Sequence, residues 1–92
     1  MNRFVNRLFE ESDKNENTNL NHIAKYGAVT YMEDGAINFW YRGKKEECVD
    51  IEFKHNRISY YIDDGKQEYR GDDVWPNRLT MLNIIEILKG IK

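Results

Sequence analysis

The middle of the chain alternates apolar and polar residues in several short runs. In CVDIEFK, residues 48–54, and RISYYID, residues 57–63, nearly every second residue is apolar. Because successive side chains of a β-strand point to opposite faces, this pattern predicts strands with one buried and one solvated face. The pair His55-Asn56 suits a two-residue turn, since both residue types tolerate positive φ. Such a turn brings the alternating apolar positions of both runs onto one face.

A second hairpin is predicted around the turn at residues 33–35. A three-residue loop with its glycine in the left-handed conformation places Val29 opposite Phe39 and Tyr31 opposite Ile37 on one face. A two-residue loop would turn less apolar surface inward, so we expect the three-residue register. In this register Trp40 points to the other face.

A further turn at Asp64-Gly65 leads to a short edge strand, KQEYR, residues 66–70. The expected register places Glu68 opposite Tyr61 and Arg70 opposite Ser59, with Tyr69 pointing inward. The following segment, residues 72–92, has the apolar spacing of a helix. Its stripe consists of Met81, Ile84, Ile85, Leu88 and Ile91.

The start of this C-terminal helix is predicted from a capping residue and a proline. Asp73 or a neighbour is expected to cap it, and Pro76 suits its first turn. At the other end of the chain, residues 2–12 predict a short amphipathic helix with Phe4 and Leu8 on its apolar stripe. The Asn-rich segment 13–22 is interpreted as a loop that leads into the sheet.

These elements predict one α+β domain spanning residues 1–92. We expect a four- or five-stranded antiparallel meander with an N-terminal and a C-terminal helix packed on one face. The face under the helices is predicted to hold Val29, Tyr31, Ile37, Phe39, Tyr41, Val49, Ile51, Phe53, Ile58, Tyr60 and Ile62.

Composition restricts the possible partners and compartments. The formal net charge is only −2, so no strong field attracts the chain to nucleic acid or to an acidic membrane. The chain has one cysteine, no apolar run near the ~20 residues of a membrane helix and no signal peptide at its start. We therefore expect a cytoplasmic protein that does not bind membranes. The frequent Asn, Lys and Ile agree with an AT-rich genome, such as that of a phage or mobile element.

The sequence lacks the residue patterns of common active sites. Cys48 and His55 lie seven residues apart, roughly 23 Å along an extended strand, which is too far for a nucleophile and its base. His22, His55 and Cys48 do not have the spacing of metal ligands. The paired carboxylates fall in turns or on the open side of the sheet, and the scattered glycines form no phosphate loop. We expect no enzymatic activity, no metal and no cofactor.

The second face of the sheet is the candidate site. It is predicted to present Trp40 and Tyr61 inside a ring of acidic residues: Asp50, Glu52, Asp63 and Glu68. Trp and Tyr are enriched among binding hot spots, and an acidic ring selects a basic partner. The alternative is an ordinary solvated face, with Trp40 covered by the stems of Arg42 and Lys54 or by the 13–22 loop.

We therefore expect a small, non-enzymatic protein-binding inhibitor of the immunity-protein or phage anti-defence type. Its partner would be a toxin or defence enzyme with a basic surface that handles nucleic acid. One alternative is a nucleic-acid-binding domain that stacks bases on the same aromatics, although the dispersed basic residues make nucleic acid the less favoured partner. Another is a structural homodimer formed through Phe9, Leu79 and Ile87 or through an exposed strand edge.

Overall fold

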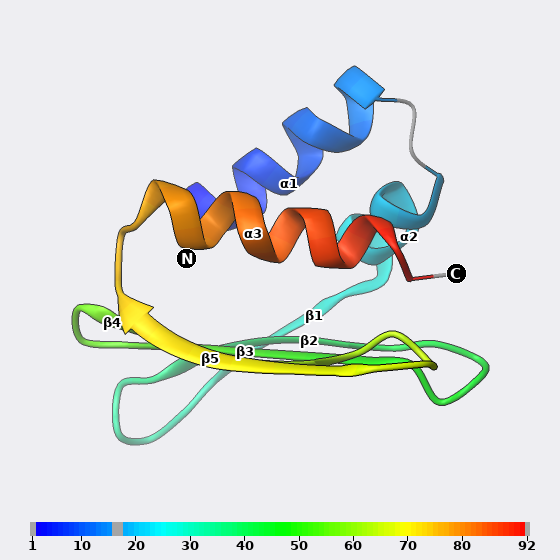
Figure 1. The fold of residues 1–92 in the computed structure, drawn as a ribbon. Helices are drawn as coiled ribbons and strands as arrows, with labels where there is room; N and C mark the ends of the chain where they lie inside the picture. Colours follow the sequence, from blue (N-terminus) through cyan, green and yellow to red (C-terminus); the bar gives the residue numbers. More distant parts are fainter. Residues whose placement is uncertain (1, 16–17, 92) are drawn as a thin grey trace.

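A computed structural model describes residues 2–15 and 18–91 (Figure 1). The described residues form a five-stranded antiparallel sheet, ordered β1-β2-β3-β4-β5, and three helices that all lie on one face of it. The predicted α+β fold is confirmed. In chain order the elements are α1 (Asn2–Asn15), α2 (Thr18–Tyr26), β1 (Ala28–Tyr31), β2 (Ile37–Arg42), β3 (Cys48–Lys54), β4 (Arg57–Asp63), β5 (Glu68–Val74) and α3 (Arg78–Lys89).

The registers of the first four strands agree with those predicted. At the β1–β2 turn Gly35 has φ +89°, and the Met32 N–H donates to the Ala36 carbonyl at 2.8 Å, as a three-residue loop requires. The β3–β4 turn contains two residues, of which only His55 adopts positive φ. The core-face pairs are Val29–Phe39, Tyr31–Ile37, Phe53–Ile58, Ile51–Tyr60 and Val49–Ile62.

The predicted register of β5 is wrong by two residues, and the strand continues to Val74. Tyr61 lies opposite Arg70, and Ser59 lies opposite Asp72. The cause is the turn. The Asp64 carboxylate accepts from the N–H groups of Lys66 and Gln67 at 2.9 and 2.8 Å, so the turn sits one residue later than expected. A shift of two residues preserves the side-chain faces.

The segment from Thr18 to Tyr26 is the helix α2, so the loop predicted for residues 13–22 is wrong. Part of that loop, residues 16–17, lies outside the described residues. Leu20, Ile23 and Ala24 are buried on one side of α2. The helix ends where the Gly27 N–H donates to the Ile23 carbonyl at 2.8 Å.

An aromatic cluster joins α1 to the sheet. The Phe4 ring lies 5.8 Å from that of Phe39, 5.7 Å from that of Phe53 and 6.4 Å from that of Trp75. These edge and tilted contacts are favourable ring geometries. The rest of the core consists of Leu8, Leu20, Ile23, Val49, Ile51, Ile58, Ile62, Met81, Ile84, Ile85, Leu88 and Ile91, among others.

The helices do not cover the whole predicted apolar face. Val29 and Tyr31 are 40% and 74% exposed, so their predicted burial is wrong. They belong to the edge strand β1, and the hairpin that β1 forms with β2 bends away from the helix layer (Figure 1). Burial on the predicted face therefore stops at β2, where Phe39 is 2% exposed.

Helix α3 begins later than the predicted capping residue and proline suggested. Its N-cap is Asn77, whose side-chain oxygen accepts from the Thr80 N–H at 3.1 Å. Pro76 precedes the cap and follows a cis peptide bond, while Asp73 lies in β5 and accepts from the Thr80 hydroxyl at 2.7 Å. The backbone stays extended through Val74 because β5 continues to pair with β4. None of the described helices has the length and apolar character needed to cross a membrane.

Candidate functional site

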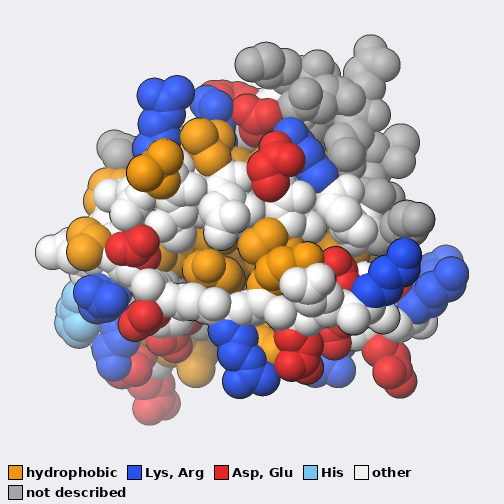
Figure 2. Space-filling view, viewed as in Figure 1, with side chains coloured by type: hydrophobic (Ala, Val, Ile, Leu, Met, Phe, Trp, Pro, Cys, Tyr) orange, Lys and Arg blue, Asp and Glu red, His pale blue; other side chains and the backbone are white. Residues whose placement is uncertain are grey.

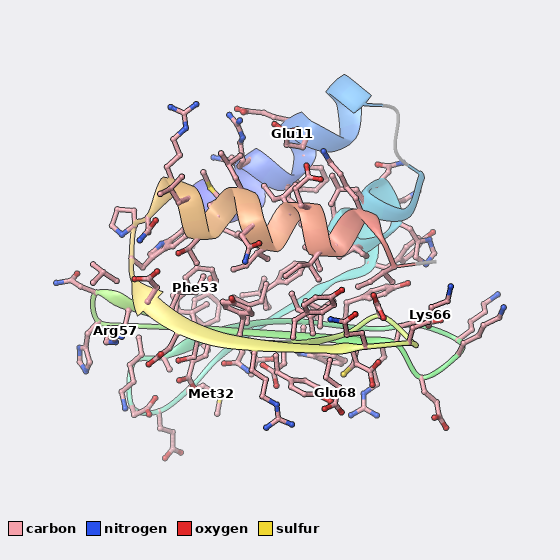
Figure 3. The ribbon with its side chains drawn as sticks, in the orientation of Figure 1. Glu11, Met32, Phe53, Arg57, Lys66 and Glu68 are labelled. Carbon is pink, nitrogen blue, oxygen red and sulfur yellow. The ribbon has the colours of Figure 1, made fainter. Side chains whose placement is uncertain are left out.

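The sheet face away from the helices, here called the open face, carries all six residues predicted for the site. Trp40 is in β2, Asp50 and Glu52 in β3, Tyr61 and Asp63 in β4, and Glu68 in β5. Figure 2 shows charged side chains along the lower side of the sheet, and apolar ones between the sheet and the helices. In Figure 3 Phe53 lies on the helix side, whereas Glu68 projects to the other side.

A row of four residues crosses the centre of the open face. Trp40 is opposite Asp50, Asp50 is opposite Tyr61, and Tyr61 is opposite Arg70. Since neighbouring strands lie about 4.8 Å apart, the two aromatic positions are roughly 10 Å apart with the carboxylate between them. This row places an anionic group between two aromatic side chains.

Hydrogen bonds orient the side chains of the row. The Trp40 indole N–H donates to Thr30 Oγ1 at 3.1 Å, and the Tyr61 hydroxyl donates to Glu68 Oε1 at 2.7 Å. The bond to Glu68 raises the pKa of the Tyr61 phenol, because the neutral form is the donor. Both aromatic anchors are thus oriented by partners on neighbouring strands.

The acidic ring contains more basic residues than expected. The Arg70 guanidinium lies 5.0 Å from the Tyr61 ring centroid and 3.6 Å from the Glu68 carboxylate. The Arg57 guanidinium likewise forms an ion pair with the Asp72 carboxylate, at 3.4 Å. The contact between Arg70 and Tyr61 depends on the observed register of β5, since the expected register placed Arg70 beside Ser59.

Two carboxylates at the middle of β3, Asp50 and Glu52, have no ion-pair partner among the described residues. Asp50 accepts one hydrogen bond, from the Asn38 amide at 2.8 Å. These two carboxylates remain available to cations that approach from outside.

Trp40 is partly exposed, and two of the three covers that the alternative named, Lys54 and the 13–22 loop, lie elsewhere, while Arg42 borders the same hollow as Trp40. The Trp40 side chain is 43% exposed, although it is one of the largest apolar groups in the chain. Helix α2, which replaces the expected loop, lies on the opposite side of the sheet (Figure 1). Lys54 extends to Asp34, with its Nζ 3.0 Å from the carboxylate.

A shallow hollow of about 610 Å³ adjoins this tryptophan on β2, β3 and β4. Cys48 lies in it, and burial, followed by the nearby Asp63 carboxylate, raises the pKa of its thiol. A raised pKa keeps the thiol protonated and poorly nucleophilic. Among the side chains that the structure describes, no three His, Cys, Asp or Glu gather in a metal-binding arrangement.

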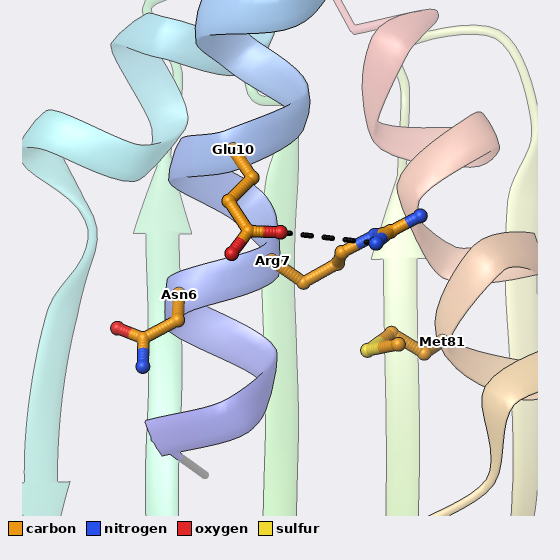
Figure 4. Close-up of a pocket in the computed structure, with 4 residues that line it drawn as sticks. All are labelled: Asn6, Arg7, Glu10 and Met81. Atoms are coloured by element: carbon orange, nitrogen blue, oxygen red, sulfur yellow. Dashed lines mark ion pairs between the residues drawn. The ribbon is translucent and has the colours of Figure 1, made fainter.

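A second hollow, about 460 Å³, lies between α1 and α3 (Figure 4). Arg7 borders it, and its guanidinium is 3.7 Å from Glu10 and 3.1 Å from Glu11. Lys89 of α3 lies 3.9 Å from Glu11. These charges pair with one another and connect the two helices, so this hollow is explained by packing.

Neither protein-family models, nor curated proteins, nor solved structures give a significant match to this chain. What it does must therefore be inferred from its own residues.

Proposed function

We propose that this chain is a small, non-enzymatic protein-binding inhibitor that acts through its open face. The observation that carries the proposal is Trp40, a 43% exposed indole next to the carboxylate of Asp50, which has no ion-pair partner among the described residues. The core does not need this side chain, because the neighbouring Phe39 supplies the buried aromatic. An exposed tryptophan on a rigid sheet suits a binding anchor.

Trp40 and Tyr61 would supply most of the binding energy. Truncating a tryptophan or tyrosine at a hot spot typically costs about 2 kcal/mol or more. Their hydrogen bonds to Thr30 and Glu68 already restrict their rotamers. This preorganisation lowers the side-chain entropy lost on binding.

The carboxylates would select the partner. Asp50, Glu52, Asp63 and Glu68 favour a basic surface and speed its approach at low salt. A basic surface that handles nucleic acid would meet these carboxylates where it otherwise meets phosphates. The inhibition would then be steric and electrostatic.

This mechanism fits an immunity protein that blocks a nuclease toxin, or a phage-encoded inhibitor of a defence enzyme. Both act on enzymes that work on intracellular nucleic acid, so the expected compartment is the cytoplasm.

A pull-down with matched variants tests the proposal. The bait is the full chain as wild type, as the double variant Trp40→Ala/Asp50→Lys, and as Leu79→Ala. Leu79 is 80% exposed on the helix side and serves as the control. We expect wild type and Leu79→Ala to capture the same basic protein and to inhibit it stoichiometrically, and the double variant to lose both. Full retention by the double variant would refute the placement of the site.

Nucleic-acid binding is the second candidate, and the stacking of Arg70 on Tyr61 favours it. A cation beside an aromatic ring is a feature of surfaces that bind single strands. Labelled RNA and DNA are titrated against the chain at several salt concentrations. Submicromolar binding that weakens steeply with salt would favour this candidate over the inhibitor. No binding at low salt would eliminate it.

A further inference from the structure

The two edges of the sheet differ in charge. The outer strand β5, with sequence EYRGDDV, carries four charged residues along the edge. The opposite edge, β1, has the sequence AVTY and carries none. Charged residues on an edge strand discourage pairing with another chain, whereas a neutral edge permits it.

The backbone of β1 has hydrogen-bonding groups that point away from the sheet. The Met32–Ala36 bond at the turn makes that pair a hydrogen-bonded one. Because such pairs alternate along an antiparallel ladder, Thr30 and Ala28 bond to β2, and the groups of Val29 and Tyr31 point outward. By the same alternation, the backbone groups of β5 that point away from the sheet belong to Glu68, Arg70, Asp72 and Val74. The first three of these residues are charged.

The side chains next to these outward groups are exposed and apolar. Val29 and Tyr31 are 40% and 74% exposed on the helix side of β1. Tyr26 and Met32, at the two ends of the strand, are also exposed. An added strand would therefore gain apolar contact as well as backbone hydrogen bonds.

We propose that β1 pairs antiparallel with β1 of a second copy of this chain, about a two-fold axis at Thr30. This register places Val29 opposite Tyr31 of the second copy, twice, so that the outward groups of both residues are satisfied. An axis at Val29 would instead use Gly27, whose N–H already donates to Ile23. An axis at Tyr31 would place Glu33, a residue of the turn, opposite Val29.

Charge complementarity favours a second copy as the occupant. In this register the turn that begins with Glu33 comes beside the residue before β1 in the other copy, Gly27. The end of α2 next to Gly27 carries Lys25. Asp34 of this turn already pairs with Lys54 at 3.0 Å, so Glu33 is the carboxylate that each copy brings toward Lys25 of the other, and β1 itself adds no like charges.

Pairing would place the open faces of both copies on the same side of a continuous sheet. Trp40 lies opposite Ala28 of β1, so the two copies of Trp40 would flank the new junction. Two linked binding faces increase apparent affinity for a partner that presents two sites. The pairing does not depend on the proposed function, and its tests need no partner.

Cysteine crosslinking tests the register. Thr30 would face its own copy in a pair without backbone hydrogen bonds, where Cα atoms are about 4.5 Å apart, within disulfide range. In a Cys48→Ser background, Thr30→Cys should form a disulfide-linked dimer under mild oxidation. The control is Met32→Cys, because the two copies of residue 32 would lie roughly 14 Å apart, beyond disulfide range. Crosslinking of Thr30→Cys no faster than that of Met32→Cys would overturn the proposal.

Sedimentation equilibrium on the full chain tests the interface itself. Wild type should dimerise reversibly below about 1 mM, and Tyr31→Lys should weaken the dimer at least about tenfold. Leu79→Lys, at an equally exposed site on α3, should leave it unchanged. A monomer up to about 1 mM, or a dimer that Leu79→Lys dissociates while Tyr31→Lys does not, would overturn the proposal. Circular dichroism checks that both variants remain folded.

Discussion

Phe39 and Trp40 are neighbours in β2, but they lie in opposite environments. Phe39 is 2% exposed and packs against Phe4 of α1, whereas Trp40 is 43% exposed on the open face and bonds to Thr30. The same contrast separates the two faces along β3 and β4. Val49, Ile51 and Phe53 are buried, whereas Asp50 is exposed and Glu52 is only half-buried.

This contrast separates stability from recognition. Residues on the covered face are held by helices, rings and close packing, so a change there disturbs several neighbours. Residues on the open face interact through a few surface hydrogen bonds and ion pairs, which contribute little to folding. The open face can therefore change its partner without changing the fold.

The largest expected loss of stability comes from truncating Phe39, and truncation of its neighbour Trp40 provides the comparison. Phe39→Ala should lower the free energy of unfolding by about 3–5 kcal/mol, because it leaves a cavity in the core. Trp40→Ala should cost less, about 1–2 kcal/mol, because the indole is already 43% exposed and its one hydrogen bond lies at the surface. Urea unfolding of both variants measures the difference. Equal losses would mean that Trp40 belongs to the core and would remove the contrast between the faces.

A second test acts on Gly27, where the end of α2 packs closely against the sheet. A Cβ added at Gly27 would collide with the Phe39 ring and lie 2.8 Å from the Ile23 carbonyl. Gly27→Ala should therefore destabilise the protein by about 1–3 kcal/mol. At Gly90 the nearest atom to an added Cβ is the Ile87 carbonyl oxygen, 3.4 Å away, so Gly90→Ala is the control. Thermal melts compare them, and a neutral Gly27→Ala would mean that α2 is not packed closely against β2.

A smaller loss of stability is expected from removing the N-cap of α3. Asn77→Ala removes the cap that accepts from the Thr80 N–H and should cost about 1 kcal/mol. Asn83, exposed in the middle of α3, provides the matched control. Asn83→Ala should stabilise the helix by several tenths of a kcal/mol, because Ala has the higher helix propensity. Chemical denaturation should show opposite signs, and the same sign for both would contradict the assigned cap.

The smallest expected effect concerns the turn before β5. The N–H groups of Lys66 and Gln67 lower the pKa of the Asp64 carboxyl below 3.8. Its contribution to stability is complete above the ordinary Asp pKa and is lost as the pH falls through the lowered value. Asp64→Asn keeps an acceptor but does not titrate, so the variant should be less stable than wild type at about pH 6, and this difference should narrow as the pH falls to about pH 2.5. Urea midpoints at both pH values measure this, and a gap that widens in acid would contradict the sign.

The candidate site was predictable as a set of residues but only partly as an arrangement. Trp40, Asp50 and Tyr61 were expected on one face, and they form one row across it. The contact of Arg70 with Tyr61 was not expected, because it depends on a turn that two backbone N–H groups shift by one residue. The binding role of these residues remains a prediction.

Helix α2 shows why some of the helix layer was not predictable. Among its described residues, the buried ones are Leu20, Ile23 and Ala24, in a segment that also contains Asn, Thr, His and Lys. Three apolar residues do not distinguish a nine-residue helix from a polar loop, and short helices are marginal in isolation. Packing against α1 and α3 stabilises it.

The sequence by itself determined which strand residues share a face, because side chains alternate with a period of two and even the misplaced β5 register preserved it. It also determined the hairpin turns at residues 33–35 and 55–56, where short loops leave few registers. Only the tertiary structure decided the presence of α2, the exposure of β1 and the neighbours of Tyr61. Those features depend on contacts between residues distant in the chain, whose free energy no local pattern encodes.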